Sequence, residues 1–170
     1  GADLFFESLY YLEKISNIKP CVVLFGEDKP QNKVHYSPFP IIYMGKIEDE
    51  IIMSKLYAAC DIMIVPSRQE AFGQTASEAH ACGTPVISFN VGGLSDIVDN
   101  GVTGILVSPF DTKGMAYSIS KLLSSPQLLK SFSLNAIERS HSLWSEQRIS
   151  NMYTNAYQLA IKSHYHNVNA

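Results

Sequence analysis

Apolar and polar positions along residues 1–110 form blocks that predict strands and helices in turn. Short, predominantly apolar runs predict buried strands at residues 21–25, 41–44, 62–65, 86–89 and 105–107, and the first three are closed directly by glycine or proline. The segments between them predict an opening helix through Ile15, helices over residues 49–59 and 74–82, and a short helix before Asp99. This alternation predicts an α/β fold, a Rossmann-like parallel sheet with helices on both faces.

After Pro109 the pattern changes to helices only. Residues 112–124 predict one helix, Ser125-Pro126 predicts the start of a second that ends near residue 140, and Ser145 predicts the cap of a third. The third helix carries an apolar stripe of Ile149, Met152, Tyr153, Ala156, Tyr157 and Ala160. Its tyrosines favour core packing or docking against another domain over stacking on a base. A chain of 170 residues suits one domain, so residues 1–170, with the helices of residues 112–163, are assigned to a single domain.

Composition and charge narrow the possible functions. Hydrophobic residues make up 46% of the chain and charged residues 17%, which is enough apolar material for a packed core. The net charge of −3 argues against binding the phosphate backbone of nucleic acids, which needs a basic face. No apolar run approaches the roughly 18 residues that span a bilayer. Three widely spaced cysteines predict buried thiols in a reducing compartment, so we expect a cytoplasmic protein. Because of the net charge, we expect no nucleic-acid partner.

Several motifs that would fix a chemistry are missing from the sequence. It contains no GxGxxG dinucleotide fingerprint, no P-loop and no GxSxG nucleophile elbow. It also contains no His, Cys, Asp or Glu cluster with metal-ligand spacing and no DxD-type carboxylate pair. We therefore expect neither a metal ion nor a bound cofactor.

The segment after the strand at residues 62–65 is the most informative part of the chain. Open parallel sheets bind ligands at the carboxyl ends of their strands, where this segment begins. Gly73 allows a tight turn and close approach of a ligand to the backbone. The helix that starts at Gln74 directs free N–H groups and its positive dipole end at the same edge. This arrangement predicts an anion site for phosphate groups.

Two glutamates flank the start of that helix. Glu70 precedes it and Glu78 lies one turn inside it, where a carboxylate can accept hydrogen bonds from two neighbouring hydroxyls of a ribose or hexose. The alternative is that both are solvated charges that suit a helix N-terminus.

The residues around the two glutamates resemble the retaining glycosyltransferases of GT-B fold, specifically glycosyltransferase family 4. The signature of that family, a glutamate, seven residues and a second glutamate, is EAFGQTASE at residues 70–78. The flanks also match, at residues 61–67, 79–86, 92–93, 96–98, 104–107 and 144–157. The resemblance covers essentially the whole chain and is closest to bacterial enzymes that build surface or exported polysaccharides.

The resemblance implies a role for each residue of the motif. Glu70 would be the catalytic residue that faces the donor sugar, and Glu78 would hold the nucleotide ribose. Backbone amides would contact the sugar at Ala71, Phe72 and Gly73 and the diphosphate at Gln74 and Thr75. The nucleotide base would lie against Gly45, Lys46 and Ile47.

Other residues near the motif are interpreted as structural. Lys46 taken alone is more often a solvated residue at the lip of a site than a phosphate ligand. His80 stands where the family usually has methionine, and we interpret it as a packed helix residue rather than a base. Gly92 and Gly93 are interpreted as a tight turn from strand to helix, and Arg68 as a surface residue.

The implied reaction transfers a hexosyl unit from a UDP- or GDP-sugar to an acceptor hydroxyl with retention of anomeric configuration. In GT-B enzymes an N-terminal domain binds the acceptor, a sugar or lipid-linked sugar, and that domain is absent from this sequence. The family's lysine and arginine that neutralise the leaving diphosphate are absent too. We therefore expect a donor-binding domain that is inactive alone, from a cytoplasmic enzyme peripheral to the inner face of the membrane.

The resemblance also places the first strand of this domain upstream of Gly1. The strands at residues 21–25 and 62–65 would then pair directly, leave a gap that a partner chain fills, or lie on either side of the upstream strand if that segment is present in the protein. Unpaired apolar strand edges invite pairing, so self-association is expected.

Two other functions stay open. A GT-B epimerase or phosphorylase would hydrolyse the donor without an acceptor or bind pyridoxal phosphate, and the spacing of Glu70 and Glu78 weighs against both. A non-catalytic module that binds sugar nucleotides is the second alternative. A gene without an acceptor domain would favour it.

Overall fold

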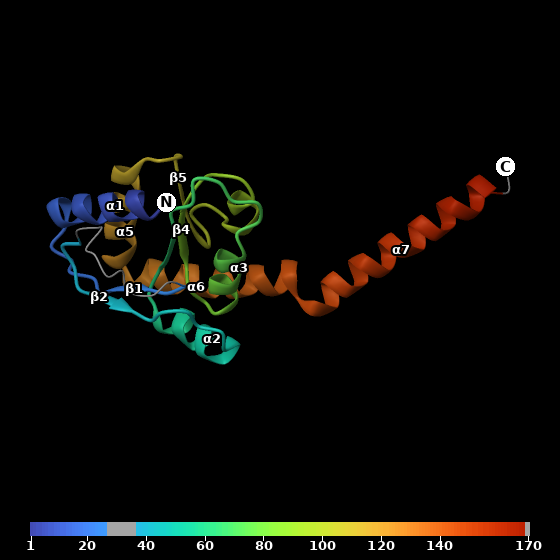
Figure 1. Ribbon diagram of the computed structural model, residues 1–170, viewed down its shortest axis with the longest axis horizontal. Helices are drawn as coiled ribbons and strands as arrows, with labels where there is room; N and C mark the ends of the chain where they lie inside the picture. The colour runs from blue at the N-terminus through green and yellow to red at the C-terminus, as the bar shows by residue number, and fades with distance from the viewer. Residues whose placement is uncertain (27–36, 169–170) are drawn as a thin grey trace.

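The computed structural model describes residues 1–26 and 37–168, without the side chains of residues 165–168. The polar stretch with Pro30 and Pro38 predicts a loop at residues 26–38, and most of it lies outside the described residues. The described helices and strands alternate as the sequence pattern predicts (Figure 1). In chain order they are α1 (Ala2–Ile15), β1 (Val22–Leu24), β2 (Ile41–Tyr43), α2 (Glu50–Ala59), β3 (Met63–Val65), α3 (Gln74–Ala81), β4 (Val86–Phe89), α4 (Leu94–Ile97), β5 (Gly104–Val107), α5 (Thr112–Leu123), α6 (Pro126–Trp144) and α7 (Glu146–Val168).

All strand pairings in the described residues are parallel, which confirms the predicted fold class. β3, β4 and β5 form one sheet in that order, with Met63 opposite Val86 and Val86 opposite Gly104. β1 and β2 form a second sheet, with Val22 opposite Ile41. No ladder joins β1 to β3 in the part of the chain that the structure describes. The direct pairing of residues 21–25 with residues 62–65, one of the three alternatives for the expected gap, is therefore not formed.

The three-stranded sheet lies between two apolar layers because side chains of a strand point alternately to opposite faces. On one face Ile87 and Phe89 of β4 pack with the buried residues of α1 and α5, among them Leu12 and Met115. On the other face Val86 packs with the buried residues of α3 and α4. The four residues of β4 are buried throughout, as the continuous apolar run predicts.

Side-chain caps fix the starts of α2 and α5, within a residue of where the sequence pattern places these helices. Asp49 Oδ1 accepts hydrogen bonds from the amides of Ile51 and Ile52, at 2.8 and 3.0 Å, and begins α2. Asp111 caps α5 by accepting from the Gly114 amide at 2.9 Å. Such caps satisfy amides that have no acceptor within the helix.

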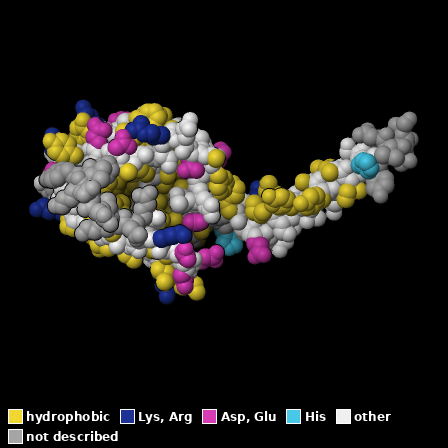
Figure 2. All heavy atoms as spheres, viewed as in Figure 1, with side chains coloured by type: hydrophobic (Ala, Val, Ile, Leu, Met, Phe, Trp, Pro, Cys, Tyr) yellow, Lys and Arg dark blue, Asp and Glu magenta, His cyan; other side chains and the backbone are white. Residues whose placement is uncertain are grey.

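The C-terminal helices differ from the prediction in two respects. α6 continues past residue 140 to Trp144, and Ser145, with extended backbone, separates it from α7. α7 projects away from the rest of the molecule (Figure 1), and apolar side chains lie exposed along it (Figure 2). Tyr153 and Tyr157 are 62% and 65% exposed, so the prediction that they belong to a core is wrong for this chain. Docking against another surface stays a prediction.

Two further findings concern the cysteines and the helices. Cys21 is exposed, and Cys60 and Cys82 are partly exposed, so the prediction of buried thiols is wrong. Among the described helices none has the length and apolar character needed to cross a membrane.

Candidate functional site

The loop between β3 and α3 lies at the carboxyl edge of the three-stranded sheet and ends at Gly73. The backbone of Gly73 has a φ of 96°, a conformation that other residues adopt only with strain. Space is also short there, because an added Cβ would lie 2.8 Å from Leu94 Cδ2. The Gly73 carbonyl accepts hydrogen bonds from the amides of Ala76 and Ser77, at 3.0 and 3.1 Å. α3 therefore starts immediately after this glycine.

The first amides of α3 lie at the carboxyl edge of the sheet, directly after Gly73. The N–H groups of the first turn of a helix have no acceptor inside that helix. In α3 the leading residues are Gln74 and Thr75, which are exposed and partly exposed. Amides in this position, at the positive end of the helix dipole, attract phosphate groups.

Glu70 lies on the loop and lines a cavity. Its Oε2 accepts a hydrogen bond from Ser67 Oγ at 3.3 Å, and its side chain is partly buried. The cavity has a volume of about 470 Å³ and is lined by Arg68, Gln69, Glu70, Ala71, Val91 and Gly92. The structure thus places the first glutamate of the motif at an open cavity beside the sheet edge.

Glu78 is held by two hydrogen bonds from neighbouring side chains. Its Oε2 accepts from the Tyr57 hydroxyl at 3.0 Å and its Oε1 from Gln74 Nε2 at 3.0 Å. Tyr57 belongs to α2 and is 3% exposed. Burial raises the pKa of Tyr57, and the hydrogen bond and charge of Glu78 raise it further, so the phenol stays protonated and donates. The carboxylate is therefore fixed in orientation before any ligand arrives.

Glu70 and Glu78 do not line the same cavity. Glu78 is absent from the residues that line the cavity of Glu70. It lies instead with Tyr57 and Gln74 on the side of α3 that faces α2. Their sharing of one crevice, which the sequence suggests, stays a prediction.

Gly92 and Gly93 support the loop through close backbone contact. The Gly93 amide donates to the Glu70 carbonyl at 3.1 Å. A Cβ at Gly92 would lie 1.8 Å from the Glu70 carbonyl oxygen, and one at Gly93 would lie 2.5 Å from that of Ala71. These glycines allow the turn that the sequence predicts, and they also leave room for the loop that carries Glu70.

The candidate base-binding loop follows β2. The Gly26 amide donates to the Gly45 carbonyl at 2.9 Å, which ties this loop to the end of β1. Lys46 Nζ forms an ion pair of 2.8 Å with Glu48, and both side chains are about three-quarters exposed. This pair fits the interpretation of Lys46 as a solvated lip residue. Ile47 is partly exposed.

A buried tyrosine connects the end of β1 with α3. The Phe25 ring, at the end of β1, packs edge-on against Tyr57 with 5.7 Å between centroids. Tyr57 also donates to Glu78, so it links the β1–β2 sheet to α3. Sequence reasoning missed Tyr57 because a tyrosine inside an apolar helix carries no local sign of a partner 21 residues away.

Two interpretations of neighbouring residues are confirmed. His80 is packed inside, at 1% exposed. Arg68 lies at the surface, where it forms an ion pair with Asp3 and its guanidinium lies 5.6 Å from the Phe110 ring centroid. In the described part of the chain no group of three His, Cys, Asp or Glu side chains is arranged to hold a metal ion.

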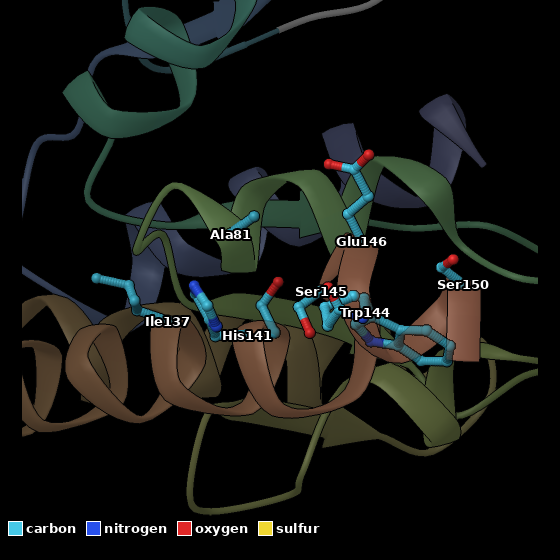
Figure 3. A pocket seen from close by; sticks show the side chains of 9 residues that line it. Ala81, Ile137, His141, Trp144, Ser145, Glu146 and Ser150 are labelled. Atoms are coloured by element: carbon cyan, nitrogen blue, oxygen red, sulfur yellow. The ribbon is translucent and has the colours of Figure 1, made fainter. Parts of the chain in front are cut away.

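A second, larger cavity lies where α3, α6 and α7 meet (Figure 3). It has a volume of about 700 Å³ and is lined by Ala81, Ile137, Ser140, His141, Trp144, Ser145, Glu146, Gln147 and Ser150. None of the candidate site residues from the sequence is among them. Trp144, however, contacts the loop of the first cavity, because its ring packs edge-on against Phe72 with 5.2 Å between centroids.

Comparison with known proteins gives a consistent result. The profile of a family described as "Glycosyl transferases group 1" matches residues 1–125. A D-inositol 3-phosphate glycosyltransferase of Thermobispora bispora is 40% identical over 105 residues, which are 60% of this chain and 24% of that relative. The chain thus spans about a quarter of the length of this curated relative.

Solved structures share the fold. Sucrose-phosphate synthase from Thermosynechococcus elongatus matches 96% of this chain and 44% of its own, with a TM-score of 0.78 and 27% identity. HepE from Anabaena, in complex with UDP and glucose, matches 67% of this chain and 32% of its own, with a TM-score of 0.59 and 27% identity. The parallel sheets flanked by helices therefore match part of each of these larger chains.

Proposed function

Because the chain belongs to the group 1 glycosyl transferases, we propose that it is the C-terminal, donor-binding domain of a retaining GT-B enzyme of glycosyltransferase family 4. The enzyme transfers a hexosyl unit from a nucleoside-diphosphate sugar to an acceptor hydroxyl, in the synthesis of a polysaccharide or other glycan. The observation that carries this proposal is the loop from Glu70 to Gly73 followed directly by the N-terminus of α3.

In the proposed site each part of the donor has a matching group. The amides of Gln74 and Thr75 receive the diphosphate and stabilise the charge that it gains as it leaves. Glu70, at its open cavity, faces the hydroxyls of the sugar. Glu78, oriented by Tyr57, accepts hydrogen bonds from the ribose hydroxyls.

A solved structure of similar fold supports a nucleotide sugar as the donor substrate. HepE is described in complex with UDP and glucose, and its structure aligns with this chain. We infer a UDP- or GDP-sugar donor on this basis. The acceptor binds to a part of the enzyme outside this chain.

Thermal unfolding in the presence of donors tests the proposal. UDP-glucose, GDP-mannose and ADP-glucose are each added to the chain at millimolar concentration, with glucose alone as the control. Binding to the folded state raises the midpoint of unfolding, and the rise grows as the ligand concentration exceeds its dissociation constant, so at least one of the three sugar nucleotides should raise it. Glu78→Gln should reduce that rise, whereas Glu138→Gln, at an exposed site on α6, should leave it unchanged. A midpoint that no sugar nucleotide moves, together with no heat of binding, would refute donor binding.

A further inference from the structure

The single tryptophan of the chain contacts the candidate donor loop. Trp144 and Phe72 pack edge to face, with 5.2 Å between ring centroids and 88° between ring planes. Phe72 is 43% exposed, whereas Trp144 also packs against the apolar layer that α3 and α4 help to form. Phe72 is thus held at the surface by a side chain from an element far along the chain.

A second contact fixes the backbone of the loop. Gly92 and Gly93 lie against the backbone of Glu70, Ala71 and Phe72, with the Gly93 amide hydrogen bonded to the Glu70 carbonyl. The backbone of residues 70–72 is therefore held by these glycines and, at its end, by the start of α3 after Gly73. The side chain of Phe72 is held by its ring contact with Trp144.

Trp144 lies at a break between two helices. It is the last residue of α6, and Ser145, with φ −60° and ψ 144°, separates it from α7. The open cavity of about 700 Å³ lies beside this break, and Trp144 is one of its lining residues (Figure 3). The ring contact therefore connects the loop with the junction of α6 and α7.

We propose that Trp144 is a positioning residue for donor binding. Through Phe72 it holds the amides of residues 71–73 in the orientation that receives the sugar of the donor. The proposal rests on the proposed function, because it assumes that this loop receives the sugar. Its effect falls on the sugar more than on the nucleotide, since Glu78 is oriented by Tyr57 and Gln74 instead.

Calorimetric titration with UDP and with UDP-glucose separates the two parts of the donor. If the chain binds GDP-mannose or ADP-glucose instead of UDP-glucose, the titration uses that sugar nucleotide together with its own nucleoside diphosphate. Trp144→Ala should weaken binding of the sugar nucleotide by up to about tenfold and that of the nucleoside diphosphate by less than about threefold. Trp144→Phe, which keeps an aromatic edge against Phe72, should restore most of the loss. Tyr153→Ala, at an exposed aromatic residue of α7, is the control and should change neither affinity.

The fluorescence of Trp144 distinguishes the positioning role from a purely structural one, because a structural role alone would not change the emission when the sugar nucleotide binds. Because Trp144 is the only tryptophan, a change of its emission on adding the sugar nucleotide reports on the contact with Phe72. The change should appear in the unmodified chain and disappear in Phe72→Leu. Phe72 is substantially exposed, so this variant tests the contact even if Trp144→Ala does not fold.

The outcomes separate the two proposals. If the unmodified chain binds none of the three sugar nucleotides, the proposed function is wrong. If the unmodified chain binds one of them, and both Trp144→Ala and Phe72→Leu bind it with the same affinity as the unmodified chain, donor binding stands and the positioning role is overturned. Equal weakening of the nucleoside diphosphate and its sugar derivative in these variants also overturns it, because the effect is then not specific to the sugar.

Discussion

The buried imidazole of His80 makes the folded chain sensitive to mild acid. His80 lies on α3 with 1% of its surface exposed, and among the described atoms its Nε2 has no hydrogen-bond partner. Burial lowers the pKa of His80, a backbone hydrogen bond with Thr103 raises it and the charge of Arg139 lowers it, which together bring the pKa to about 4. The side chain is therefore neutral in the folded state at pH 7.

The size of the effect follows from the two pKa values. In the unfolded chain the imidazole titrates near its ordinary pKa of 6.5, so between pH 6.5 and pH 4 the unfolded state binds more protons than the folded state. The free energy of unfolding therefore falls as the pH falls through this window. The loss is about 2 kcal/mol between pH 7 and pH 5 and approaches ~3 kcal/mol at pH 4.

His80→Met removes this proton site and keeps a side chain of similar volume. Urea unfolding followed by circular dichroism at pH 7, 6 and 5 gives the free energy of unfolding of both proteins. The carboxylates titrate in both, so their contribution cancels in the difference, which should grow by about 2 kcal/mol in favour of the variant from pH 7 to pH 5. His141→Met, at an exposed position on α6, is the control and should retain the acid sensitivity. A difference that stays constant over this pH range would refute the buried, neutral imidazole.

Four further predictions concern the site and the assembly. In the full-length enzyme Glu70→Ala should cut turnover strongly, because it removes a contact at the reacting sugar, whereas Glu78→Ala should weaken binding of free nucleoside diphosphate by about 1–3 kcal/mol; unchanged affinity would argue against the ribose role. Tyr57→Phe should weaken the same binding by ~1 kcal/mol in calorimetry, and an equal effect on a Glu78→Ala background would exclude coupling through that carboxylate. Gly92→Ala should lower the melting midpoint far more than Gly101→Ala, since both have positive φ but only Gly92 lacks space for a Cβ; equal shifts would contradict the crowding. Sedimentation velocity at micromolar concentration should show self-association of the chain through its open strand edges, and a strictly monomeric boundary would reject it.

The elements of the fold could be predicted because their signals are local. The strand at residues 86–89 and the helix beginning near Asp49 were predicted correctly, because the signal for each lies within a few residues of the chain. The loop and helix start around Gly73 were predicted for the same reason. The roles of Glu70 and Glu78 came from the family resemblance, and they stay predictions.

What sequence reasoning missed depends on contacts between distant elements. The bond of Tyr57 to Glu78 and the ring contact of Phe72 with Trp144 each join two separate helices or a helix and a loop, and no spacing along the chain specifies them. α6 continues to Trp144, beyond the predicted end, where tertiary packing at that residue favours the helix. The division into two sheets likewise depends on which strand edges meet in space.

That division has a consequence for how the molecule opens. Between the three-stranded sheet and the β1–β2 pair the described residues form no ladder, and the contacts at the junction include the packing of Phe25 on Tyr57 and the hydrogen bond of Tyr57 to Glu78. Proteins open locally in cooperative units, and a unit held by fewer contacts opens at a lower free energy. The amides of β1 and β2 should therefore exchange with solvent through a local opening of lower free energy than those of β4, which lies between two strands and is buried along its whole length. The loop that holds Gly45 follows β2, so we expect its amides to exchange as readily as those of β1 and β2. The part of the proposed site that would bind the nucleotide base should therefore open more easily than the part built on β3, β4 and α3.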